Sequence, residues 1–520
     1  MANLITRRYF MNTGFRATMA AAFASLGNVP GFVQRAIAEG TIGTRGKKVL
    51  FIFLRGGNDG INNVIPIEDP GYLAARTAIA ITKDPDPTVM TRYSTAGGSC
   101  DVVGPAYPYA IPLGNGFAAL HPALYELAPV YNSTVPGEPG DLAIIHRVAY
   151  PRQSRSHFDS EKYWENGSPY SNNLKEGIFY RTMIESGLAG QRALMAVSVQ
   201  SNMPLIIRGE YPMTNLGDPL RYDLLGVNYT SSSSRDRVKQ IDANEAATLR
   251  PYPAKDNRTL VYGLGKQFHE TLDIFQQIGF ANNNFVDPQG VQLFNINDSY
   301  YKNLKAAAQI LANTNAIVAG TQFGGFDTHT AQGGVTGGHA NLLRRIGHTM
   351  YALKHFFSNP AYNNGGGSGQ GRNLWNDIVV VTLSEFGRTS IENASSGTDH
   401  AEASVMYVAG GAVNGGVYAC DPSANATMGV PNWTPADPGW TVTSPAANGG
   451  SMFGASSRYL KRAVDYRSVL GEIIRDHLGA TQAQLNRIIP AYANESVEHL
   501  RSGISISGST TPIIGELGII

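Results

Sequence analysis

Val379-Val-Val-Thr-Leu-Ser-Glu-Phe-Gly-Arg388, followed by Gly397-Thr-Asp-His400, is the stretch that decides the fold. Its run of β-branched and apolar residues predicts a strand buried on both faces, as in a parallel sheet. The run ends at Glu385, and a Gly-rich turn then carries Asp399 and His400. Open α/β sheets bind ligands at the carboxyl ends of their strands, so we expect the chemistry of the chain at this edge.

Further apolar runs predict more strands, and apolar residues at helical spacing predict the helices between them. We expect strands over residues 48–54, 141–148, 193–199, 316–323 and 405–411. Helices are expected over residues 120–127, 156–164, 260–280, 300–311, 337–357 and 465–478. Strands that alternate with helices predict an α/β domain.

Length and composition set the outer limits of the protein. With 520 residues and 42% hydrophobic content, the chain can bury a large core, in one large domain or two. We predict the domain over residues 39–500 and a C-terminal tail over 501–520. Its 58 glycines and 28 prolines indicate many loops, with insertions expected near residues 70–116, 210–258 and 412–457. The net charge of +1 argues against nucleic-acid binding but leaves small anionic substrates open.

The N-terminus carries the pattern of an export signal. Arg7 and Arg8 precede an apolar run over residues 19–26, and Ala36-Ile-Ala38 offers the small residues that a signal peptidase reads. We predict a twin-arginine signal over residues 1–38, recognised by the twin-arginine translocase, and a periplasmic or secreted protein. The alternative is an amphipathic helix with a basic start. No other stretch is apolar enough to span a bilayer.

The cysteine count limits the redox chemistry. Cys100 and Cys420 are the only cysteines, so a thiolate metal cluster is excluded. In an oxidising compartment the two could form one disulfide, and the alternative is a pair of free thiols in loops.

Acidic and imidazole side chains follow four of the predicted strands or turns. They are Asp59, Ser156 with His157, Asp327 with His329, and Glu385 with Asp399 and His400. Such residues behind parallel strands predict a site for one or two divalent ions, with zinc, manganese or calcium as candidates. Two ions clamp the attacking and leaving oxygens of a displacement at phosphorus or sulfur, and a hydroxyl such as that of Ser156 would be the nucleophile.

Two of these residues have equally simple structural explanations. Ser156 and Asp159 fit a Ser-x-x-Asp helix cap, whereas a serine at a helix start flanked by Arg152, Arg155 and His157 also fits an anion site. Asp59, in turn, fits an Asx turn as well as it fits a metal ligand.

The remaining histidines have weaker signals. His121 is expected to be structural. His348 and His355 lie off the apolar stripe of their predicted helix, so we expect them to face solvent. His339, at the start of the same helix, is a possible ligand or cap.

Five motifs taken together resemble a known family. They are Phe53-Leu-Arg-Gly-Gly-Asn-Asp-Gly60, Ser156-His-Phe-Asp-Ser160, Phe326-Asp-Thr-His329, Ser384-Glu-Phe-Gly-Arg-Thr389 and Gly397-Thr-Asp-His400. With the export signal, they look like the family catalogued as domain of unknown function 1501, over nearly the whole mature chain. That family is grouped with the alkaline phosphatase and sulfatase superfamily. The resemblance implies a three-layer α/β/α sandwich with a mostly parallel sheet and a di-metal hydrolase site.

The resemblance also implies roles for individual residues. Asp59 matches the metal ligand after the first strand, and Asp327 with His329 matches the next carboxylate–histidine pair. Glu385 stands where the superfamily has Asp-His, and His400 resembles the last histidine ligand. Ser156, assisted by His157, is the best match to the catalytic nucleophile, and the expected substrate-binding residues are Asn58, Arg152, Arg155 and Arg388.

Two functions follow from these motifs. The first is an exported metal-dependent hydrolase of phosphate or sulfate esters, acting on a small anionic ester or a polysaccharide. The second is an inactive relative that binds or assembles with a partner outside the cytoplasm through its insertions. Phe386, which stands where a superfamily enzyme carries histidine, favours the second function. The acidic and histidine residues at the other positions favour the first.

Overall fold

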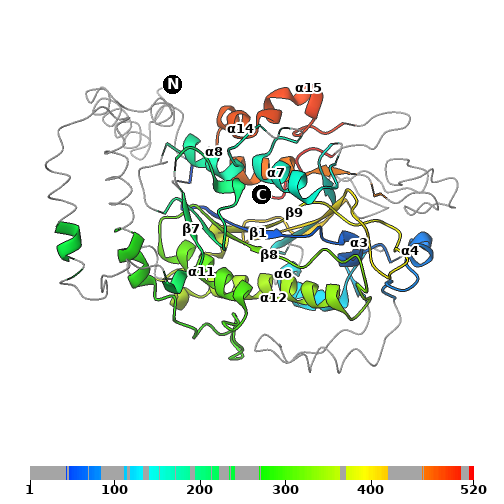
Figure 1. Ribbon diagram of the computed structural model, residues 1–520, viewed down its shortest axis with the longest axis horizontal. Helices are drawn as coiled ribbons and strands as arrows, with labels where there is room; N and C mark the ends of the chain where they lie inside the picture. The colour runs from blue at the N-terminus through cyan, green and yellow to red at the C-terminus, as the bar shows by residue number, and fades with distance from the viewer. Residues whose placement is uncertain are drawn as a thin grey trace, which may run out of the picture.

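The protein is an α/β structure in which helices cover both faces of a large, mostly parallel sheet (Figure 1). The computed structural model describes residues 42–43, 46–67, 69–82, 110–113, 118–132, 140–151, 153–169, 171, 173–187, 194–211, 213–221, 234, 236–240, 269, 271–363, 371–419, 459–460, 462–504 and 514–520. The predicted signal over residues 1–38 and both cysteines lie outside these ranges.

The large sheet contains nine strands within the described residues, in the order β11-β5-β10-β9-β1-β8-β6-β7, with β12 paired to β5. Their bounds are β1 Lys48–Leu54, β5 Leu142–Ala149, β6 Ala196–Val199, β7 Thr214–Leu216, β8 Val318–Phe323, β9 Ile378–Ser384, β10 Ser404–Ala409, β11 Gly416–Tyr418 and β12 Val464–Asp465. A small antiparallel sheet has the order β2-β4-β3, with β2 Val64–Ile65, β3 Ile111–Pro112 and β4 Ala119–Leu120.

The predicted central strand, β9, lies in the middle of the sheet and is buried along its whole length. It pairs in parallel with β1, and β1 pairs in parallel with β8. The register places Leu54 opposite both Ser384 and Phe323, so the three carboxyl ends are level. The loops that follow these strands therefore start at one edge of the sheet.

One pairing differs from the expectation of parallel neighbours. The run predicted over residues 405–411 forms β10, which is antiparallel to both β9 and β5. The physical reason is the connection, because residues 385–403 return directly from the end of β9 without a crossover helix. Since β10 is antiparallel to both neighbours, β5 runs in the same direction as β9, and its carboxyl end reaches the same edge.

Helices of two layers enclose the sheet, with α7, α8 and α14 on one side and α11 and α12 on the other (Figure 1). The helix bounds are α3 Gly60–Asn63, α4 Pro70–Ala75, α6 Ala128–Tyr131, α7 His157–Asn166, α8 Ile178–Glu185, α11 Ser299–Asn313, α12 Gly338–Ser358, α13 Tyr466–Glu472, α14 Gln482–Ile488 and α15 Glu495–Glu498. Short helical turns are η1 Pro122–Leu127, η2 Leu205–Ile207, η3 Pro219–Arg221, η4 Pro360–Tyr362, η6 Trp375–Asp377, η9 Ile473–His477 and η10 Pro490–Asn494.

Most predicted helices are confirmed, with local differences. The helix predicted over 120–127 is the tighter η1, and the helix predicted over 465–478 widens from α13 into the π-type turn η9. Much of the helix predicted over 260–280 lies outside the described residues, which are helical over 271–278.

The end of the chain is part of the core. The prediction of a loose tail over residues 501–520 is wrong for its last residues, because Ile514, Leu517 and Ile519 are buried. The buried carboxylate of Glu472 accepts hydrogen bonds from the backbone N–H groups of Leu517 and Ile519, the latter at 2.8 Å. A side chain distant in sequence thus anchors the C-terminus.

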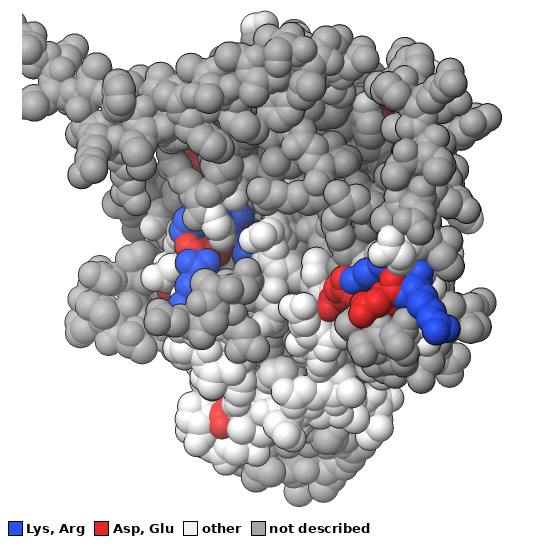
Figure 2. All heavy atoms as spheres, turned by 90° about the vertical axis from the view of Figure 1, so that its left-hand side faces the viewer, with Lys and Arg blue, Asp and Glu red and all other residues white. Residues whose placement is uncertain are grey.

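The surface carries charged side chains of both signs. Figure 2 shows the face at the left of Figure 1, where the described Lys and Arg side chains lie beside Asp and Glu side chains in mixed groups. Among the helices that the structure describes, none combines the length and apolar character needed to cross a membrane.

Candidate metal site

Four loops meet at the edge of the sheet where β1, β5, β8 and β9 end. Two glycines after β1 allow them to approach closely, since Gly56 and Gly57 have positive φ angles of 111° and 80°. A Cβ atom on Gly56 would lie 2.5 Å from the backbone nitrogen of Asp327. On Gly57 it would lie 2.4 Å from the ring of Phe386. The turn after β1 is therefore the packing surface for both neighbouring loops.

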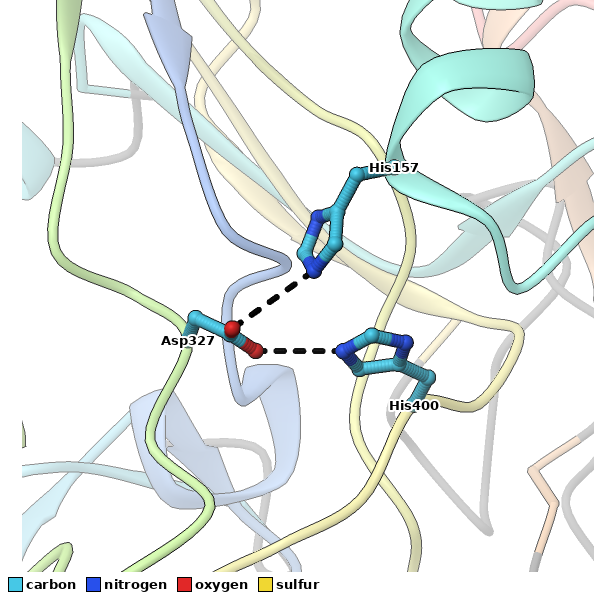
Figure 3. A group of neighbouring side chains, drawn as sticks. All are labelled: His157, Asp327 and His400. Carbon is cyan, nitrogen blue, oxygen red and sulfur yellow. Dashed lines mark hydrogen bonds and ion pairs between the residues drawn. The ribbon is translucent and has the colours of Figure 1, made fainter.

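Three side chains from three of these loops form a compact group, shown in Figure 3. His157 begins α7, Asp327 follows β8, and His400 follows β9. The Asp327 carboxylate points between the two imidazoles, with His400 Nε2 at 3.1 Å and His157 Nε2 at 3.6 Å. Their candidate ligand atoms all lie within 4.8 Å of one another. The side chains are partly exposed, so solvent can reach them.

His329 extends the group on one side. Its Nε2 lies 3.0 Å from Asp327 Oδ1 and 3.0 Å from His400 Nε2. Its Nδ1 lies 3.2 Å from Asp399 Oδ1, and the Asn393 amide donates to the same oxygen at 3.0 Å. Asp399 therefore orients His329 and does not itself face the group.

An acceptor on the far side of each ring fixes the orientation of these three histidines. His157 Nδ1 lies 2.5 Å from Glu385 Oε2, and His400 Nδ1 lies 2.8 Å from the carbonyl oxygen of Arg155. A carbonyl can only accept, so the Nδ1 of His400 carries the proton. With Asp399 behind His329, each ring has its Nδ1 beside an acceptor, and the tautomer that this favours turns the lone pair of Nε2 toward Asp327.

This arrangement has the chemistry of a cation site. Lone pairs on Nε2 and a carboxylate oxygen repel each other at such distances unless a cation lies between them. Zinc bonds of about 2.0–2.2 Å place tetrahedral ligand atoms roughly 3.3–3.6 Å apart. His400 Nε2 lies 3.1 Å from Oδ1 of Asp327 and His157 Nε2 lies 3.6 Å from Oδ2, so each contact, made with a different carboxylate oxygen, is close to that range. The donors therefore suit zinc or a similar divalent ion.

The ionisation of the group is consistent with ligand chemistry at neutral pH. Burial raises the pKa of Asp327, but the hydrogen bond and the positive charge of Arg388 outweigh it and lower the pKa to about 2. Burial lowers the pKa of His400, which favours the neutral imidazole. Burial raises the pKa of Glu385, against the opposing effect of His157.

Arg388, which was predicted to bind substrate, has a buried side chain. Its guanidinium is fully buried and donates to Asp327 Oδ1 at 2.5 Å. It also donates to the carbonyl oxygens of Gly56, Gly57, Phe326 and Thr398. Arg388 therefore joins three loops and positions Asp327. Its positive charge also repels cations, which disfavours the binding of several metal ions nearby.

Phe386 forms the apolar wall of the site. Its ring centroid lies 4.9 Å from that of His157 and 4.6 Å from that of His400. It is fully buried and packs against both imidazoles. Phe386 thus supports the imidazoles of two histidines that contact Asp327.

Asp59 is not part of the group, which contradicts its predicted role as a metal ligand. Its carboxylate is fully buried and pairs with Arg76 through contacts of 2.6 Å and 2.9 Å. Gln332 donates to it at 2.6 Å. Burial raises the pKa of Asp59, but Arg76 outweighs it and leaves the pKa below its ordinary value. Both oxygens are therefore occupied by protein donors.

Glu385 also differs from its predicted role. Its Oε2 faces His157 Nδ1 and its Oε1 accepts from the Gly56 backbone at 3.2 Å. It therefore orients a ligand from behind, as carboxylates do in carboxylate–histidine–metal triads. His157, which the sequence analysis assigned to catalysis beside Ser156, has its ring nitrogen among the atoms that could hold a metal ion.

Of the remaining residues that were predicted to act in catalysis or substrate binding, those that the structure describes do not belong to the group around Asp327. Ser156 caps α7, with its Oγ 3.5 Å from the Asp159 nitrogen, so the capping interpretation is confirmed. Asn58 is fully buried against Ser384 and His339. Arg152 lies outside the described residues. Arg155 is exposed beside the site, 3.4 Å from Glu402, with its guanidinium 3.7 Å from the Tyr459 ring centre.

Two histidines elsewhere, His121 and His348, have structural partners. His121 caps η1 through a 3.0 Å bond from the Ala123 nitrogen, which confirms its structural role. The prediction that His348 faces solvent is wrong, because it is buried and bonds to Glu126 and to the Leu293 carbonyl. The spacing of apolar residues along one helix does not indicate whether a polar residue of another element contacts that helix.

The contact between Glu385 and His157 gives a first prediction. Glu385→Gln is expected to weaken zinc affinity by about 10–100-fold, because a neutral amide holds the imidazole less firmly than a carboxylate does. Titration with zinc chloride would measure the change. Glu161→Gln is the matched control, since Glu161 lies on α7 and pairs with Arg55. Equal affinity in Glu385→Gln and the wild type would contradict the prediction.

Comparison with known proteins identifies one family over part of the chain. Residues 296–427 match the family described as "Protein of unknown function (DUF1501)". No curated protein and no solved structure matches the chain. The matched segment carries Asp327, His329, Glu385 and His400, whereas His157 lies outside it. This segment is therefore similar to a family of unknown function.

Proposed function

We propose that the protein is a metal-dependent hydrolase of phosphate or sulfate esters, with one divalent ion held by His157, Asp327 and His400. The observation that carries the proposal is the orientation of the histidines. Hydrogen bonds behind each ring leave the Nε2 lone pairs facing the Asp327 carboxylate. His329 is adjacent and completes the group. Zinc and manganese suit nitrogen and carboxylate donors better than calcium, which prefers oxygen ligands.

The protein residues have distinct tasks in such a reaction. A divalent ion bound there would polarise the ester and make water nucleophilic at neutral pH. Water is favoured over Ser156 as the nucleophile, because the Ser156 hydroxyl caps α7. Arg388 holds Asp327 in place, and Phe386 excludes water from one side of the imidazoles. The buried guanidinium favours a single ion over the two that the superfamily resemblance implies.

Anionic substrates suit the rim of the site. Arg155 projects from the segment just before α7, and its side chain is 43% exposed. The N-terminus of α7 lies next to His157, and helix N-termini attract anions. An arginine beside such a terminus binds the oxygens of a phosphate or sulfate through charge-assisted hydrogen bonds. We therefore propose Arg155 as a substrate-binding residue.

Arg155→Gln is expected to raise KM roughly ten-fold or more for 4-nitrophenyl phosphate or sulfate, with a much smaller change in kcat. The substitution keeps the backbone carbonyl that holds His400, so metal binding should be preserved. Steady-state kinetics would measure both constants. Arg208→Gln, an exposed arginine elsewhere, is the control. An unchanged KM would exclude Arg155 from substrate binding.

The proposal extends to the superfamily and to the location of the protein. A mostly parallel sheet with helices on both faces is compatible with an alkaline-phosphatase-like sandwich, and we propose that relationship. Arg7 and Arg8 support export through the twin-arginine translocase to the periplasm or beyond.

Metal analysis of the full-length protein, followed by ester turnover, tests the proposed function. We expect about one zinc or manganese ion per chain, and turnover that chelation removes and the metal restores. Iron as the bound metal would contradict hydrolysis, because two histidines and one carboxylate also form the site of iron oxygenases. A folded protein that takes up no metal would instead favour the inactive binding protein.

A further inference from the structure

A group of hydrogen bonds outside the metal site ties the loop that carries His400 to two other segments. We call Arg76, Gln332 and Glu392 the clasp. Arg76 follows α4 and lies within the predicted insertion, Gln332 follows the Asp327 loop, and Glu392 lies in the loop between β9 and β10. None of the three has a predicted role in the sequence.

Arg76 connects the end of β1 to the start of the His400 loop. Besides its ion pair with Asp59, it donates to the carbonyl oxygens of Ser390 at 3.0 Å and Thr389 at 2.8 Å. Its side chain is fully buried. A fully buried guanidinium with fixed partners on two loops holds those loops at one separation.

Glu392 connects the same loop to the residues after Arg76. Its carboxylate accepts from Thr77 Oγ1 at 2.5 Å, from the Ala78 nitrogen at 2.9 Å and from the Ile79 nitrogen at 3.1 Å. The backbone nitrogen of Glu392 donates to the Ala75 carbonyl at 3.1 Å. The segment after α4 and the His400 loop are therefore joined in both directions.

Gln332 connects the two loops that carry the metal-facing residues. Its amide nitrogen donates to Asp59, and its amide oxygen accepts from Thr328 Oγ1 at 2.9 Å and Thr398 Oγ1 at 2.7 Å. Thr328 is next to Asp327, and Thr398 is two residues before His400. One buried side chain thus sets the spacing of both ligand-bearing loops.

We propose that the clasp positions Asp327 and His400 for metal binding, so that Arg76, Gln332 and Glu392 are positioning residues for the metal site. The inference rests on the proposed function, because it assigns them an effect on the same ion. Residues 385–403 connect β9 to β10 without regular helix or strand, so contacts from elsewhere must order them. Metal sites need such supporting contacts to hold ligands within about 0.5 Å of their working geometry.

Zinc affinity of the full-length protein tests the proposal. Glu392→Ala is expected to weaken binding of zinc chloride by about ten-fold or more, because the loss of residues that support metal ligands has an effect of this size. Glu392→Gln keeps one acceptor oxygen and should recover part of the affinity. Gln332→Met, which keeps the size of the side chain but removes its hydrogen bonds, is expected to weaken binding similarly.

Glu495→Ala is the matched control, because Glu495 also accepts from two backbone nitrogens and a serine hydroxyl, beside α15. Its zinc affinity should equal that of the wild type. Unchanged affinity in Glu392→Ala and Gln332→Met, or an equal loss in Glu495→Ala, would overturn the clasp. A wild-type protein that binds no zinc would overturn the proposed function and this inference with it. A wild-type protein that binds zinc, with clasp variants of equal affinity, would overturn the clasp alone.

Discussion

Asp327→Ala is expected to abolish stoichiometric binding of zinc or manganese and to lower the affinity by more than about 100-fold. Loss of a contact that supports a ligand lowers metal affinity by about 10–100-fold. Asp327 should have a larger effect, because it is the carboxylate that all three imidazoles face. Without its charge, only neutral nitrogens remain to bind the ion. Isothermal titration of the metal-free protein with zinc chloride would measure the loss, and ester turnover should fall with it.

The control for Asp327→Ala is a variant that removes a carboxylate far from the histidines of the site. Asp273→Ala removes a surface carboxylate that pairs with Lys239 and does not contact the histidines, so it should bind metal as the wild type does. Melting temperatures of the metal-free proteins would show that Asp327→Ala is folded. An Asp327→Ala protein that keeps stoichiometric zinc would contradict the assignment of the site.

Arg76→Met is expected to destabilise the fold by about 3–5 kcal/mol, because it leaves the Asp59 carboxylate charged and buried without its partner. Both side chains are fully buried, so water cannot replace the lost contacts. Denaturant unfolding of the metal-free variant and wild type would measure the difference in their free energies of unfolding. The double variant Arg76→Met with Asp59→Leu should recover much of the loss, because an apolar pair can replace a buried ion pair.

The same pair predicts a dependence on pH. Asp59 has a pKa below its ordinary value in the folded protein, despite the opposing effect of burial. Its contribution to stability is therefore present above the unfolded pKa of about 3.9 and is lost as the pH falls through the folded value. Arg76→Met should lose this acid dependence. A single variant that unfolds at the same denaturant concentration as the wild type would show that the pair contributes little.

The strands and the edge at which the site forms were predictable from local patterns. Continuous β-branched runs are typical of strands buried on both faces, and β1, β8 and β9 are such strands. Polar residues after those runs had to reach one edge if the strands were parallel, which is why Asp327 and His400 were found. The capping pattern at Ser156 was equally local and is confirmed.

Roles within the site were not predictable in the same way. Asp59 and Asp327 both follow apolar strands with glycines nearby, and nothing in either motif distinguishes them. Arg76 separates their roles, because it pairs with Asp59 from a stretch that has no sustained periodicity. Glu385 and His157 likewise differ from their expected roles, because the Glu385 carboxylate lies 2.5 Å from Nδ1 of His157 and turns the other ring nitrogen toward the group.

The amino-acid sequence by itself determined where the strands run, where the glycine turns fall and which edge of the sheet gathers acidic and imidazole side chains. Those properties depend on side-chain periodicity and backbone freedom over a few residues. Only the tertiary structure decided which carboxylates pair with arginine, which orient histidines and which one faces the lone pairs. Such choices depend on contacts between residues far apart in the chain, as Asp59 with Gln332 and Glu385 with His157 illustrate. Their energies depend on burial and distance, which no local pattern records.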